Sequence, residues 1–98
     1  MIEKLRGRID EIDEEILSLL NERITTARKI GKEKENRGLS IEDEAREQEV
    51  LERLQKFNDG PISDSSVQRI FRRIIEETKQ SEGEVAYNDY SNETGSQR

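Results

Sequence analysis

Apolar residues near the start of the chain recur at alternating steps of three and four. They stand at positions 2, 5, 9, 12, 16 and 19, the spacing of one helical face and not of a strand. The register continues more weakly up to Gly38, which is the first strong stop signal. We therefore expect one long helix from Ile2 to about Glu35, about 50 Å in length at the usual rise per residue.

Two shorter helices are predicted after it. Ser40 with Asp43 three residues later resembles a capping box at the start of the second helix, and the turn sequence NDGP at 58–61 ends that helix. Ser63 or Ser65 then caps the third helix. Its apolar stripe consists of Val67, Ile70, Phe71, Ile74 and Ile75, and is prolonged by Thr78 and Glu82. The fold class is all-α, with one long and two shorter helices.

The 98 residues leave room for a single domain, expected over 1–82. From Gly83 onward the sequence is polar and aperiodic, so we expect residues 83–98 to form a disordered tail. Only 30% of the residues are hydrophobic, and so short a chain buries a small fraction of its surface. A lone monomer would be marginally stable, and an oligomer is expected.

The composition excludes several functions. The chain contains neither His nor Cys, so the usual zinc sites, haem or iron–sulfur ligation, thiol or His-assisted nucleophiles and disulfides are absent. A net charge of −6 argues against nucleic acid as the main partner. No apolar stretch is long enough to span a membrane, and the first residues lack the apolar block of a secretory signal, which indicates a cytoplasmic location.

Polar residues interrupt or extend the apolar stripe of each predicted helix. They are Arg23 and Lys34 on the first helix, Asp43 and Glu47 on the second, and Thr78 and Glu82 on the third. Any one of them is explained by a fraying end, a cap or an internal salt bridge, and a basic segment over 23–37 also suits a helix C-terminus. Because buried charge is costly unless paired, the set as a whole indicates a cavity that receives an anionic ligand.

Arg6 lies 17 residues before Arg23, or about 25 Å along a continuous helix, so one small ligand cannot touch both on one chain. If two copies of the long helix pack antiparallel and cross near Leu17, the partner's Arg6 comes to lie between Arg23 and Lys34. Such a two-fold arrangement is usual for homodimers. The alternative is that Arg6 faces solvent beside the apolar stripe.

Four segments carry a resemblance to a known family. LRxxIxxID at 5–13, LLNER at 19–23, IGKxK at 30–34 and EARExxxLERL at 44–54 resemble the all-helical chorismate mutases. The similarity extends from residue 1 to about 82. It implies an intertwined antiparallel homodimer with two identical sites, which isomerises chorismate to prephenate on the way to phenylalanine and tyrosine.

The resemblance assigns Arg23 and the partner's Arg6 to the two carboxylates of chorismate, a task that suits the planar guanidinium fork. It assigns Lys34 to the ether oxygen, where negative charge grows as the C–O bond breaks. Glu82 stands where many bacterial relatives have Gln as a second donor to that oxygen. Since only the protonated acid can donate, we hypothesise that Glu82 must be protonated for full activity. Burial raises and Lys34 lowers the pKa of this carboxyl, and the sequence does not decide between them.

Asp43 and Glu47 match the groups that engage the ring hydroxyl in this family. Thr78 stands where the family usually has Ser, and its hydroxyl can make the same contact. Arg46 is expected beside the site, where it balances Glu47.

The rearrangement is unimolecular and pericyclic, so it needs no cofactor, metal or nucleophile. Holding the reactive conformer and stabilising charge separation are enough. The predicted function is therefore that of a chorismate mutase acting on a small dianionic substrate. The alternatives are an isochorismate–pyruvate lyase of the same fold, and a non-catalytic helical dimerisation or regulatory module.

Overall fold

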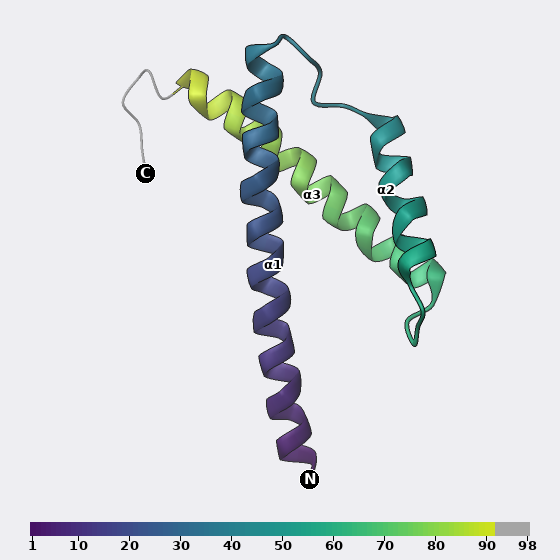
Figure 1. Ribbon diagram of the computed structural model, residues 1–98. Helices are drawn as coiled ribbons and strands as arrows, with labels where there is room; N and C mark the ends of the chain where they lie inside the picture. The colour runs from purple at the N-terminus through teal and green to yellow at the C-terminus, as the bar shows by residue number, and fades with distance from the viewer. Residues whose placement is uncertain (92–98) are drawn as a thin grey trace.

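The computed structural model describes residues 1–91, with side chains described through residue 83, and over this range the chain folds as three helices (Figure 1). They are α1 (Ile2–Asn36), α2 (Glu44–Phe57) and α3 (Asp64–Ser91). The all-α class and the long first helix are thereby confirmed. No helix of the described part is long and apolar enough to cross a bilayer. The cytoplasmic location stays a prediction.

α1 and α2 both pack against α3. α1 crosses α3 in its C-terminal half, and α2 lies along the first part of α3 (Figure 1). The N-terminal half of α1 extends away from both, which gives the chain extents of 54 × 33 × 15 Å. The two helices that flank α3 and the connection between them thus frame a space open on one side.

Side-chain caps set the starts of α2 and α3. Asp43, and not Ser40, is the N-cap of α2, because its Oδ1 accepts from the backbone N–H of Arg46 at 3.0 Å. Ser40 lies too far upstream and instead accepts from the N–H of Glu42, so the expected capping box is wrong. At α3 the side chain of Ser63 accepts from the N–H of Ser66 at 3.1 Å, which confirms one of the two predicted caps.

The end of α3 also differs from the expectation. The helix continues to Ser91, so the backbone of 83–91 is helical where a disordered tail was predicted. A single glycine costs a helix only about 1 kcal/mol, and no proline follows Gly83 to end it. The rest of the expected tail, 92–98, lies outside the described residues.

The core of the chain is small. Val50 and Leu51 of α2 pack on Ile75 of α3, with Leu54 and Phe71 against them. No large side chain of the described part is fully buried. The stripe along α1 is open instead, since Ile2, Leu5, Ile9, Ile16, Leu17 and Leu19 are each about half exposed or more. The described chain alone therefore leaves most of its predicted apolar seam in water.

Gly31 lets α1 and α3 approach closely where they cross. A Cβ at this position would lie 3.2 Å from the Cβ of Glu82, 3.3 Å from its carbonyl oxygen and 3.4 Å from its Cα. Two of these three atoms belong to the backbone, so no side-chain rotation relieves the contact. The crossing point is therefore tied to the position of Glu82.

We predict that Gly31→Ala lowers the free energy of unfolding by about 1–3 kcal/mol, because the two helices must move apart. Gly83→Ala is the matched control: nothing lies within 4 Å of its added Cβ, so it should raise stability by up to about 1 kcal/mol. Urea unfolding at one fixed protein concentration measures both. Equal stabilisation by the two alanines would show that the α1–α3 crossing has room to spare.

Candidate active site

A cleft of about 660 Å³ lies between α1, α2, α3 and the connection 37–43. Six of the seven side chains predicted from the sequence line it: Arg23, Lys34, Asp43, Glu47, Thr78 and Glu82. The seventh, Arg6, lies on the exposed N-terminal part of α1, far from the cleft of its own chain. Helix periodicity alone therefore identified groups from three helices that converge in space.

Arg23 and Thr78 join α1 to α3 at one wall of the cleft. A guanidinium N–H of Arg23 donates to the hydroxyl of Thr78, which donates in turn to the carbonyl of Ile74 at 2.7 Å. Burial lowers the pKa of Arg23, the cation of Arg46 lowers it further, and Glu82 opposes both. A partly desolvated guanidinium next to a second cation is a site that an anion stabilises.

Lys34 and Glu82 meet on the same side of the cleft. The ammonium of Lys34 lies 3.9 Å from Oε2 of Glu82 and donates to the carbonyl of Ile41 at 3.3 Å. Oε2 of Glu82 is buried and has no hydrogen-bond partner among the described residues. Burial raises the pKa of Glu82 more than Lys34 and Arg23 lower it, so the net shift is upward. The direction that the sequence left open is thus decided by desolvation.

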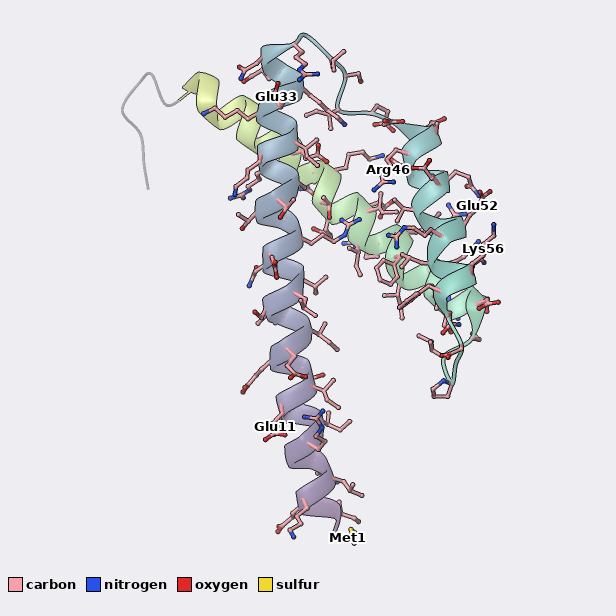
Figure 2. All side chains as sticks on the ribbon, in the orientation of Figure 1. Met1, Glu11, Glu33, Arg46, Glu52 and Lys56 are labelled. Atoms are coloured by element: carbon pink, nitrogen blue, oxygen red, sulfur yellow. The ribbon has the colours of Figure 1, made fainter. Side chains whose placement is uncertain are left out.

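Glu47 is paired differently from the expectation. Its Oε2 lies 3.1 Å from the ammonium of Lys79 on α3, whereas Arg46 pairs with Glu49 on its own helix at 2.6 Å. Arg46 does line the cleft, and Figure 2 shows it on α2 among the side chains beside the open space. The predicted balance between Arg46 and Glu47 is therefore wrong, because Arg46 reaches an exposed neighbour one turn along α2.

Lys79 is a charged cleft residue that sequence reasoning missed, and the lining residues Glu22 and Thr26 were missed as well. Lys79 also contacts Glu42 of the connection 37–43 at 3.0 Å. A signal was present: Ile75, Lys79 and Glu82 stand at i, i+4 and i+7, on the helical face that also carries Thr78. Thr78 and Glu82 flank Lys79 in the sequence and are the two polar residues predicted to prolong the apolar stripe.

Asp43 lines the cleft while one of its oxygens caps α2. Its position at the junction of connection and helix keeps the carboxylate close to the backbone. Among the described residues, no group of acidic side chains is placed to hold a metal ion.

A family model described as "Chorismate mutase type II" matches residues 5–83. The chain belongs to this family. A chorismate mutase from Methanocaldococcus jannaschii is 36% identical over 83 residues, which cover 81% of this chain and 84% of that protein. A solved chorismate mutase (form II) from Thermus thermophilus superposes with a TM-score of 0.82 at 34% identity, covering 84% of this chain and 93% of that one.

A bifunctional chorismate mutase/prephenate dehydratase from Neisseria gonorrhoeae is 49% identical over 72 residues. These residues are 74% of this chain and 19% of that protein. The chain thus spans about a fifth of the length of the bifunctional relatives and most of the length of the M. jannaschii protein.

Proposed function

We propose that the chain is a chorismate mutase that converts chorismate to prephenate. The observation that carries the proposal is the grouping of Arg23 and Lys34 in one cleft with Glu82, whose buried oxygen lacks a partner among the described residues. Membership of the chorismate mutase type II family supports it. A pericyclic rearrangement makes no demand for a nucleophile, and cations fixed before the reaction stabilise the charge that develops in it.

Arg23 binds one carboxylate of the substrate through its planar fork, and Thr78 keeps the guanidinium in place. Lys34 donates to the ether oxygen as the C–O bond breaks. Its contact with the carbonyl of Ile41 restrains the ammonium before substrate arrives. Little reorganisation is then needed in the transition state.

Protonated Glu82 supplies a second hydrogen bond to the ether oxygen. Its raised pKa favours the acid form, which is the form that can donate. Asp43 and Glu47 accept from the ring hydroxyl of the substrate, and Thr78 lines the same cleft. No cofactor or metal takes part in these steps.

The active unit is a homodimer in which α1 helices pack antiparallel. Half-exposed apolar residues along the N-terminal half of α1, such as Leu5, Ile9 and Ile16, support this arrangement because a second α1 would remove them from water. The pairing brings the partner's Arg6 to the cleft, where it binds the second carboxylate. Each chain would thus complete the site of the other.

Replacing Lys34 by alanine should lower kcat/KM for chorismate about a hundredfold or more, since a preorganised donor to the ether oxygen is lost. This factor corresponds to a loss of at least about 3 kcal/mol of transition-state stabilisation. Loss of chorismate absorbance measures the rate. Lys29→Ala is the control, because it removes the same charge from α1 outside the cleft. Equal rates in wild type and Lys34→Ala contradict the catalytic assignment, and pyruvate among the products of isochorismate would favour the lyase instead.

The pH dependence tests Glu82. Because only its acid form donates, the rate should be highest below its raised pKa and fall as the pH rises through that value. Glu82→Gln keeps a donor at every pH, so its rate should stay flat over the range in which the wild type declines. Full pH–rate profiles of both proteins make the comparison. Superimposable profiles would remove Glu82 from the mechanism.

A further inference from the structure

Lys79 occupies a central position between α2 and α3. Its side chain contributes to the wall of the cleft and also to a groove of about 370 Å³ between the two helices on its other side. Glu47 is the other charged residue that borders both spaces. The Lys79–Glu47 pair therefore forms part of the partition between cleft and groove.

The contacts of Lys79 differ from the other ion pairs of α2 and α3. Arg46–Glu49 and Arg73–Glu76 join residues one turn apart on a single helix, and their side chains are at least 60% exposed. Lys79 instead links α3 to α2, and the side chains of Lys79 and Glu47 are 29% and 26% exposed. A less solvated pair between two helices is screened less than a surface pair and restrains both side chains more.

The ion pair with Lys79 limits which ligand groups the Glu47 carboxylate can bind. Oε2 of Glu47 lies 3.1 Å from the ammonium of Lys79, which leaves Oε1 as the oxygen that can contact a ligand in the cleft. Carboxylate oxygens accept hydrogen bonds, so Oε1 selects a ligand group that donates, such as a hydroxyl. The second contact of Lys79, to Glu42 at 3.0 Å, holds the ammonium toward the connection 37–43.

We propose that Lys79 is a positioning residue that fixes the Glu47 carboxylate for recognition of the ring hydroxyl of the substrate. The inference rests on the proposed function and adds to it a residue that acts through Glu47 and does not touch the substrate. The two carboxylate contacts also raise the pKa of Lys79, so its charge persists over the working pH range.

Lys79→Met, which keeps the aliphatic stem and removes the ammonium, tests the inference. We expect KM for chorismate to rise about tenfold or more, because a charge-assisted contact is lost. We expect kcat to change by less than about threefold, because no bond to the hydroxyl forms or breaks in the reaction and its contact is the same in ground and transition states. Lys79→Arg should restore most of the affinity.

A chorismate analogue with hydrogen in place of the ring hydroxyl provides a readout that a merely structural role would not move. Its inhibition constant should change less than about twofold in Lys79→Met, because it makes no hydroxyl contact to lose. Lys79→Met should likewise add little to KM in a Glu47→Gln background. Arg73→Met is the matched control, since it removes an exposed cation from the same helix and should behave as wild type.

An unchanged KM in Lys79→Met, an equal loss of affinity for the analogue, or additive effects with Glu47→Gln would each overturn the role of Lys79. If wild type converts chorismate, that outcome leaves the proposed function intact. If wild type does not convert chorismate, both proposals fall. Should Lys79→Met lose its helical circular dichroism, Lys79→Gln takes its place with the same expectations.

Discussion

The cost of placing cations in a partly dry cleft is the constraint on which this molecule depends. Arg23 loses water to burial and gains a hydroxyl, not a carboxylate, as its hydrogen-bond partner, while Arg46 lies close enough to lower its pKa further. Lys34 has Glu82 at 3.9 Å, beyond direct hydrogen bonding. A folded chain that leaves such groups undercompensated is poised to bind an anion, since the ligand supplies the missing charge.

The helices provide rigidity at the places where this arrangement needs it. Gly31 allows α1 and α3 to touch at Glu82, and Arg23, two turns earlier on α1, is tied to the same helix through Thr78. Positions set by helix packing vary less than positions set by loops, which suits a reaction accelerated by preorganisation. The small α2–α3 core and the open stripe of α1 support the proposed homodimer, in which a second copy would contribute stability as well as a side chain.

Much of this was accessible from the sequence. Steps of three and four in the apolar pattern predicted α1 within one residue of its end, and residues that prolonged each stripe identified six lining groups of the cleft. The choice of partner for Glu47 was not accessible, because Arg46 and Lys79 are both near it and only the approach of α2 to α3 decides between them. The pKa direction of Glu82 likewise depends on how deeply the Gly31 crossing buries it.

Sharing of the site between two chains is the central claim, and complementation tests it most directly. Arg6→Ala and Arg23→Ala should each be nearly inactive alone. When equal amounts are refolded together from denaturant, about half of the dimers pair the two variants, and each of these contains one site with both arginines. The mixture should therefore recover about a quarter of wild-type activity. A mixture no more active than the two variants measured separately would contradict a site built from both chains.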